Sequence, residues 1–556
     1  MLQEPKTFTR RRPRGKARPP LTAHLAPVFV QLLLTLAAAE VLADDDGLKL
    51  ELHGYYRARA VSINNLAHER RDDVYYYEEA LGKDVLHRYR QIEWSNYLMQ
   101  KVRLEPVVRL GERVKLHLTV DALDNVIWGD NDAIATSPLF AGEGSHTGFS
   151  GNAPPSVALR RAWLDLDLTV GRLRVGRMAS HWGMGLLSHG GGTFDGPEGY
   201  HPRDFGDYHF GSIYDRVLFA TRPVTLIKHL MGHDDTDSNF ILAYAYDKLV
   251  EDPLEMDHPR EFYRPLGESG FLSNDDDDVQ EHVFVLLYRN PELELWSDQD
   301  SFSVGLYVVL RTQDKSRRVE EGNNMVTYTG EGSLIHIWDL WAKARLGPLD
   351  FETEWLAILG KTDGGVPIGK GSLLQKDARI IAGAVRLGYL SDHLDGVVEV
   401  GYSSGDGNLS DETFSQRASH PDYNVGLLLF EEVLRERTAR ILGRILSPGL
   451  QSSGGVFNST YLFPRLRYRP WPWLEGVLGV LVAWRNEATL DLYDAKRSDF
   501  LGAEIDGAVK VRWEDAHLFF ALESGYLFFG DGLKDRFLVD GTRGAFTVQS
   551  RLAFEF

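Results

Sequence analysis

The chain has 556 residues, of which 43% are hydrophobic and 25% are charged, and it contains no cysteine. A composition near the globular average excludes disordered, collagen-like and coiled-coil chains. The absence of cysteine excludes disulfide scaffolds, thiolate metal sites and a lipidated cysteine anchor. The formal net charge of −19 argues against a nucleic-acid partner, because nucleic-acid binders are normally basic.

Residues 1–43 have the organisation of a secretory signal peptide. A basic stretch over 10–18 precedes a mostly apolar stretch over 25–39, and Val41-Leu42-Ala43 fits a cleavage site. The apolar stretch is too short for a retained membrane anchor. We therefore predict cleavage after Ala43 and a mature domain over 44–556.

Beyond the signal peptide, apolar and polar residues alternate with a period of two. In the last eleven residues, Phe546, Phe554 and Phe556 share one face with other apolar residues, and Arg551 lies on the opposite face. Such alternation predicts a half-buried strand. A final strand that ends on Phe556 resembles the C-terminal signal of bacterial outer-membrane barrels, which implies recognition by the barrel-assembly machinery.

Strand length separates a membrane barrel from a soluble sandwich. The alternating segments run for ~10–13 residues, whereas strands of soluble proteins usually have ~5–6 and tilted strands that cross a bilayer need ~9–11. Connections alternate between short and long, as periplasmic turns and external loops do. We predict an all-β fold, a single transmembrane antiparallel β-barrel of about 18 strands, with about 16 as the alternative. The predicted strands are 48–60, 97–109, 113–123, 157–169, 172–178, 213–222, 239–247, 281–290, 301–311, 334–346, 349–359, 379–390, 393–403, 457–469, 474–486, 500–512, 516–529 and 546–556.

Some connections are unusual for a barrel. Residues 223–238 and 291–300 are long for periplasmic turns, so the strands around them are the least certain. The longest external loop, 405–455, contains an apolar pattern of helical period over Val425–Leu446 with arginines on the other side. This amphipathic helix could cap the loop, fold into the lumen as a plug, or lie on the membrane.

Basic residues recur on the inward face of the predicted barrel, and those we select as candidate substrate-binding residues are Arg57, Arg59, Lys101, Arg103, Lys115, Arg174, Arg465, Arg467, Lys510 and Arg512. Because barrel closure places the last strand beside the first, most of these cations can share one wall. They could form ion pairs with inward carboxylates, such as Asp167 opposite Arg174 across a turn at 170–171. Alternatively, an unpaired ladder at a constriction would select anions.

Motifs for catalysis and cofactor binding are missing. The chain has no His-Glu-x-x-His or Gly-x-Ser-x-Gly motif, and the glycine-rich segment 364–371 lacks the Ser/Thr and the helix of a phosphate loop. Ser180-His181 and Ser188-His189 place hydroxyls beside bases, but sequence neighbours seldom reach catalytic geometry. We predict no enzyme activity and no cofactor. The acidic loop 249–280 leaves a metal site open, since carboxylates suit calcium, although no EF-hand spacing is present.

One region resembles a known family. Asp124–Asn131, Arg161-Ala162-Trp163, Leu173–Arg177 and His181-Trp182-Gly183-Met184-Gly185 resemble the strand–turn–strand signature of large porin-like barrels, including the alginate-export family and related uncharacterised bacterial barrels. The resemblance implies passive passage of polyanionic or small carbohydrate substrates through an arginine-rich pore, without catalytic residues.

These observations predict an outer-membrane channel for small polar or anionic solutes, including acidic carbohydrate. The alternative is a non-conducting structural or surface-binding barrel whose lumen is filled by loops. The expected partners are the lipid bilayer, the lipopolysaccharide of its outer leaflet and the barrel-assembly machinery. The oligomeric state is left open.

Overall fold

The computed structural model describes residues 47–67, 74–78, 83–87, 92–129, 157–192, 204–208, 211–232, 238–249, 279–313, 319–322, 325–328, 333–362, 376–408, 411–435, 452, 454–488, 499–533 and 544–556. Residues 46–556 form one compact unit, to which all described residues belong. The predicted signal peptide lies outside the described residues.

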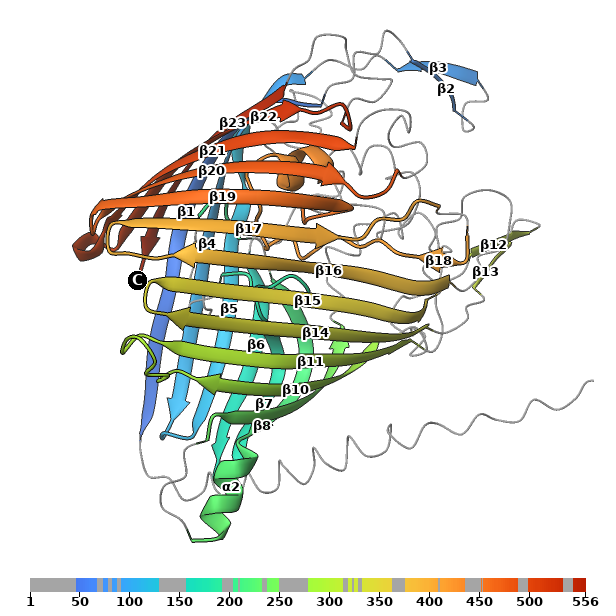
Figure 1. Cartoon of the computed structure of the whole chain (residues 1–556). Coiled ribbons are helices and arrows are strands. Elements are labelled where there is room, and N and C mark those ends of the chain that lie inside the picture. Colours follow the sequence, from blue (N-terminus) through green and yellow to red (C-terminus); the bar gives the residue numbers. More distant parts are fainter. Residues whose placement is uncertain are drawn as a thin grey trace, which may run out of the picture. The chain divides into compact units, whose positions relative to one another are not determined.

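The described strands form one closed antiparallel barrel (Figure 1). Its strands are β1 (Leu48–Ala67), β4 (Ile92–Leu110), β5 (Val114–Gly129), β6 (Val157–Leu168), β7 (Gly171–Ser180), β8 (Ser212–Thr221), β9 (Phe240–Leu249), β10 (Gln280–Asn290), β11 (Ser301–Gln313), β14 (Ser333–Leu346), β15 (Leu349–Thr362), β16 (Lys376–Tyr389), β17 (Leu394–Ser403), β19 (Ser459–Trp471), β20 (Leu474–Arg485), β21 (Phe500–Trp513), β22 (Leu518–Phe529) and β23 (Gly544–Glu555). Each pairs with the next, and β23 pairs with β1, for example at Arg59↔Arg551. The 18-strand prediction is therefore confirmed, strand by strand.

Shorter elements complete the described fold. The two-residue β18 (Thr413–Phe414) pairs in parallel with β16. Two separate hairpins are formed by β2 (Val74–Glu78) with β3 (Lys83–His87) and by β12 (Val319–Gly322) with β13 (Met325–Tyr328). No helix among the described residues is long and apolar enough to cross a membrane.

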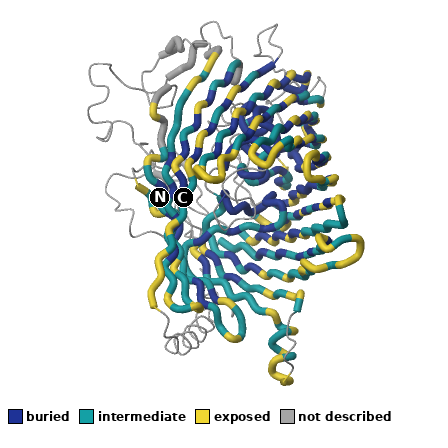
Figure 2. The backbone as a smooth tube through the Cα atoms, turned by 90° about the vertical axis from the view of Figure 1, so that its left-hand side faces the viewer, coloured by how far each residue is buried: buried dark blue, intermediate teal, exposed yellow. Residues whose placement is uncertain are grey.

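The period-two pattern matches the two faces of the barrel wall. Along β15, Asp350, Glu352 and Leu356 are buried toward the lumen, whereas Phe351 and Trp355 are exposed on the outside. Buried and exposed residues alternate in the same way along many strands (Figure 2). This outward apolar face matches the lipid-facing band of a transmembrane barrel.

Both unusually long turns are structured at the short-turn end of the barrel. The connection after β8 contains α2 (Pro223–Leu230), which begins with proline in its first turn. In the connection between β10 and β11, the Asp300 carboxylate accepts hydrogen bonds from the backbone N–H groups of Leu295 at 3.1 Å and Ser297 at 3.0 Å. These local structures explain how a periplasmic turn can be long.

The ends of the barrel differ as predicted. Strand pairs such as β14–β15 are joined by tight turns, and both β1 and β23 have a terminus at that end. Trp471 and Trp473 stack there, with ring centroids 5.3 Å apart, and both are about half exposed. Short turns and interfacial tryptophans are typical of the periplasmic end of such barrels.

One predicted cross-strand pair was wrong by two residues. The turn after β6 places Leu168 opposite Gly171, so Asp167 lies opposite Arg172 and Asp165 lies opposite Arg174. Arg172 Nε donates to Asp167 at 2.6 Å, and Arg174 Nη2 lies 2.9 Å from Asp165. The cause is the position of the turn: the two connecting residues are 169–170 rather than 170–171, and moving a two-residue turn by one position shifts each cross-strand partner by two.

Candidate functional site

The inward face of the barrel changes character along the strands. In β1, Arg57 and Arg59 occupy inward positions nearer the periplasmic end, and the following inward positions are Val61 and Ile63. In β14, Arg345 lies near the periplasmic end, and Ile335 and Ile337 occupy the other half. The outer half of the lumen therefore has an apolar wall.

Two loops fold into that outer half. We call residues 181–192 and 204–208, between β7 and β8, the first inward loop, and residues 404–408 and 411–435, between β17 and β19, the second inward loop. Buried residues of both loops, such as Phe205 and Leu428, join inward wall residues in one apolar cluster. Together these loops form a plug, which buries apolar wall surface that would otherwise face water.

A wall carboxylate holds the first inward loop. Glu354 of β15 is fully buried, and its carboxylate accepts hydrogen bonds from the backbone N–H groups of Met184, Gly185 and Leu186. Gly183 has a φ of +57°, and a Cβ there would lie 2.5 Å from Glu354 Oε2. Glycine therefore lets the loop backbone approach this carboxylate closely.

An equivalent carboxylate holds the second inward loop. Glu504 of β21 is fully buried and accepts hydrogen bonds from the N–H groups of Leu427 at 2.6 Å, Leu428 at 2.7 Å and Leu429 at 2.7 Å. A carboxylate that satisfies the first N–H groups of a helical turn stabilises the start of that turn. Neither Glu354 nor Glu504 was singled out as functional by the sequence.

The predicted helix over Val425–Leu446 is partly described. Residues Leu429–Leu434 form the π-helical turn η2, and all of them are buried in the lumen. Of the three alternatives, the plug is therefore confirmed for the described part. The segment 436–446 lies outside the described residues.

Barrel closure brings most of the predicted cations onto one wall, since β21, β22, β23, β1, β4 and β5 follow one another in the sheet. On this wall Arg103 donates two hydrogen bonds to Asp121, at 2.7 and 2.9 Å. Lys101 Nζ lies 3.2 Å from Asp121 and 3.0 Å from Asp124. These buried cations are paired with carboxylates.

Other predicted cations bind the first inward loop to the wall. Arg57 Nη1 donates to Asp207 of this loop at 2.5 Å. Arg465 Nη1 lies 2.9 Å from Asp204, and Arg467 also donates to Asp204. Burial raises the pKa of Asp204, but Arg465 and Arg467 outweigh it and hold the pKa well below its usual value. The loop is thus held by charge-assisted hydrogen bonds.

The remaining predicted cations have varied surroundings. Arg59 donates to Gln549 at 2.5 Å, Lys510 lies 3.4 Å from Glu475, and Arg512 lies 3.6 Å from Glu555 near the periplasmic rim. Lys115 forms no ion pair within the described part of the chain. Where the structure describes them, most of the ten cations belong to an ion-pair network, and their role in substrate binding stays a prediction.

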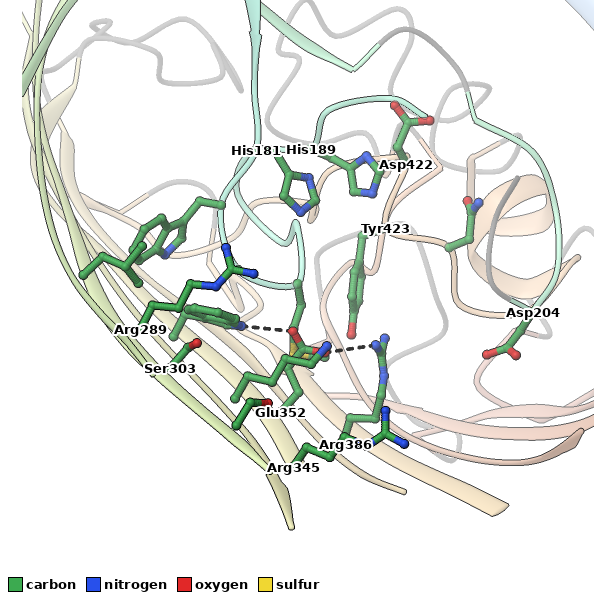
Figure 3. A pocket seen from close by; sticks show the side chains of 18 of the residues that line it. His181, His189, Asp204, Arg289, Ser303, Arg345, Glu352, Arg386, Asp422 and Tyr423 are labelled. Carbon is green, nitrogen blue, oxygen red and sulfur yellow. Dashed lines mark hydrogen bonds and ion pairs between the residues drawn. The ribbon is translucent and has the colours of Figure 1, made fainter. Parts of the chain in front are cut away.

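A cavity of about 660 Å³ lies on the periplasmic side of the plug (Figure 3). Plug residues Trp182, Phe205 and Tyr423 line it together with wall residues such as Ser303. The cavity shares Gln299 and Arg345 with a second hollow at the turns of the periplasmic rim. The two hollows therefore adjoin each other at these two residues.

Cations outnumber carboxylates in the lining of this cavity. The charged lining residues are Arg289, Lys343, Arg345, Arg386, Arg465, Asp204, Glu352 and Asp422. Glu352 is shared by Lys343 at 3.3 Å and Arg386 at 3.5 Å. Within the described chain, Arg289 and Arg345 form no ion pair, and Arg345 donates only to the neutral Gln299 at 2.9 Å. Figure 3 shows both guanidinium groups beside the cavity.

Histidines of the plug also border the cavity. His181 and His189 lie edge to face, with ring centroids 4.9 Å apart. Burial, together with the neighbouring His181, lowers the pKa of His189 to about 3, so His189 is neutral at physiological pH. His181 also borders another cavity, distinct from the hollow at the rim, with a volume of about 550 Å³. Its lining includes Lys115, Arg161 and Arg174.

The two Ser-His neighbours do not form a nucleophile–base pair in the described structure. Ser180 Oγ accepts a hydrogen bond from Arg216 at 3.1 Å, and His189 Nδ1 accepts one from the N–H of Gly191 at 2.9 Å. Among the described residues, no group of three or more candidate ligands could hold a metal ion. The acidic segment 250–278 lies outside them.

Comparisons with known proteins find similar solved structures, all at low sequence identity. No sequence family and no curated protein matches the chain. Three similar solved structures are OccK8 (OprE) of Pseudomonas aeruginosa (10% identity, TM-score 0.43, 91% of this chain and 98% of that chain), a BenF-like porin from Pseudomonas fluorescens Pf-5 (9%, 0.43, 91% and 98%) and OmpT of Vibrio cholerae (8%, 0.35, 92% and 99%). The resemblance to the alginate-export family stays a prediction.

The class of protein therefore follows from this chain's own strand pairing and surface. A closed antiparallel barrel with an apolar outer band and short turns at one end is the architecture of an outer-membrane protein. The chain is an outer-membrane β-barrel with two loops folded into its lumen.

Proposed function

We propose that this barrel is an outer-membrane channel for small polar and anionic solutes, with acidic carbohydrates as the first class to test. The observation that carries the proposal is the cationic cavity on the periplasmic side of the plug. There, Arg289 and Arg345 line the cavity without an ion-pair partner among the described residues. Guanidinium groups stay charged at any working pH and bind carboxylates bidentately.

Aromatic residues suit the cavity to organic anions rather than to small inorganic ions alone. Trp182 and Trp341 line it, with ring centroids 6.1 Å apart. Indole faces can pack against the apolar faces of sugar rings while the cations bind acidic groups. This function requires neither a catalytic residue nor a cofactor.

Electrical recording in planar bilayers tests the proposal. We expect the wild-type channel to prefer anions in a salt gradient, and we expect Arg289→Gln/Arg345→Gln to lower this preference severalfold. Arg222→Gln, which removes an exposed cation before α2, serves as the control for a loss of charge. A cation-selective wild-type pore would contradict the proposal.

The second candidate function is a non-conducting structural or surface-binding barrel. The apolar plug favours it, because buried loop residues such as Leu427 and Phe430 fill part of the lumen. Absence of any conductance in the wild type and in variants with a loosened plug would favour this candidate over a channel.

A further inference from the structure

The outward face of β15 defines the height of the apolar band. Leu349, Phe351, Trp355 and Leu359 are exposed on this face. Leu349 and Leu359 are about ten residues apart, which is roughly 33 Å along a strand at ~3.3 Å per residue. At a tilt of about 40° this spans about 25 Å along the membrane normal, the height of the lipid-facing band of such barrels.

Charged side chains begin where this band ends, on the side of the long loops. Lys361 is the next outward residue of β15, and its cross-strand partner on β16 is Asp377. Arg379 lies opposite Leu359, and its side chain is 66% exposed. On β14, the exposed His336 also lies opposite Leu359. This group therefore lies at the level of the outer-leaflet headgroups.

The pairing within this group leaves positive charge facing outward. Arg379 Nη2 donates to Asp377 Oδ2 at 3.3 Å, and within the described chain Lys361 has no ion pair. On the other side of the barrel, Arg177 instead donates two hydrogen bonds to Asp215, at 2.9 and 2.8 Å. A single long contact engages less of the guanidinium than a bidentate one.

We propose that Lys361 and Arg379 bind a phosphate group of the lipopolysaccharide headgroup in the outer leaflet. Lys361 and Arg379 supply cations at the headgroup level, and both residue types bind phosphate. Leu359 and Ile381 are exposed directly below them and offer an apolar surface to the acyl chains. Asp377 orients Arg379 and leaves the group with a net positive charge. This proposal is independent of conduction through the lumen.

Lipopolysaccharide binding to the purified, folded full-length barrel tests the site. We expect Lys361→Gln/Arg379→Gln to lower the affinity about tenfold, since it removes two charge-assisted contacts. The matched control is Arg222→Gln/Lys228→Gln, which removes one cation directly before α2 and one in its last turn, at the periplasmic end, and should bind as the wild type does. Heat-modifiable gel migration confirms that each variant is folded.

A second measurement identifies the group that is bound. Enzymatically dephosphorylated lipopolysaccharide should bind the wild type as weakly as intact lipopolysaccharide binds the double variant. Equal binding of intact and dephosphorylated lipid by the wild type would overturn the proposal. So would wild-type affinity in the double variant.

Discussion

The same strands build both halves of the lumen wall, but the periplasmic half carries charged side chains and the outer half carries apolar ones. In β19, Arg465 and Arg467 face the periplasmic half, whereas Tyr461 and Phe463 face the plug. The charged half stays wet or ion-paired, because burying an unpaired charge is costly. The apolar half is stable only when covered. Inward apolar residues on membrane-length strands therefore indicate that this half of the wall is covered, and in this barrel the two inward loops cover it.

Two wall carboxylates hold the plug against the wall. Glu354 and Glu504 each accept hydrogen bonds from three consecutive N–H groups of an inward loop. Without these acceptors, the loop N–H groups would be buried without partners. The plug therefore depends on polar contacts within an apolar region.

Of the three changes considered, removal of the Glu504 carboxylate should have the largest effect, because it uncovers part of the apolar outer half. We expect Glu504→Ala to release the second inward loop, because three buried N–H groups lose their acceptor at a cost of about 1–3 kcal/mol each. Channel conductance should rise severalfold, and the amides of Leu427 and Leu428 should lose hydrogen-exchange protection. The control Glu292→Ala changes an exposed turn residue. Unchanged protection in Glu504→Ala would refute the role of this carboxylate.

In the charged half, removal of a buried cation should lower the free energy of unfolding. Arg103→Ala leaves the buried Asp121 with Lys101 as its nearest remaining cation, so we expect a loss of about 3 kcal/mol of unfolding free energy in urea titrations. The control is Arg512→Ala, whose side chain is 47% exposed and 3.6 Å from Glu555, and which should cost less than about 1 kcal/mol. Equal costs for the two variants would show that burial does not govern these pairs.

The smallest expected effect is a pH dependence of the plug. Burial outweighs the opposing effect of Arg59 and raises the pKa of Glu431 to about 8. The carboxyl group of Glu431 therefore binds its proton more tightly in the packed plug than in the unfolded chain. The stability of the packed plug should fall as the pH rises from about 4.5 to about 8. Below that window this group contributes no pH dependence.

Hydrogen exchange of Leu429–Leu434 at pH 5 and pH 9, corrected for the intrinsic rate, measures this effect. We expect a few-fold loss of protection at the higher pH in the wild type and a flatter response in Glu431→Gln. A wild-type response in Glu431→Gln would assign the pH dependence to another group.

Much of the fold was accessible from the sequence because membrane strands obey local rules. Period-two alternation over a bilayer-spanning length located all eighteen strands, including those around the two long turns. The site was accessible only in part. The cations were placed on the inward face correctly, but the sequence left open which of them were paired.

Some of the missed information was visible in the pattern. Inward positions such as Ile335, Ile337, Leu356 and Ile358 are apolar, which is unexpected for an aqueous lumen. They indicate that something covers the outer half of the wall. The pattern does not say what covers it, because an inward loop and a second apolar surface bury such residues equally well.

The sequence by itself determined the strands, their order and their two faces, since each depends on alternation within about ten residues and on hydrogen bonds between consecutive strands. Only the tertiary structure decided the plug and the charge pairing. Glu504 meets Leu427–Leu429 and Arg57 meets Asp207 across large sequence separations, through loops whose course no local pattern sets. The same holds for the cationic cavity, where Glu352 and Asp204 are paired with other cations and not with Arg289 or Arg345.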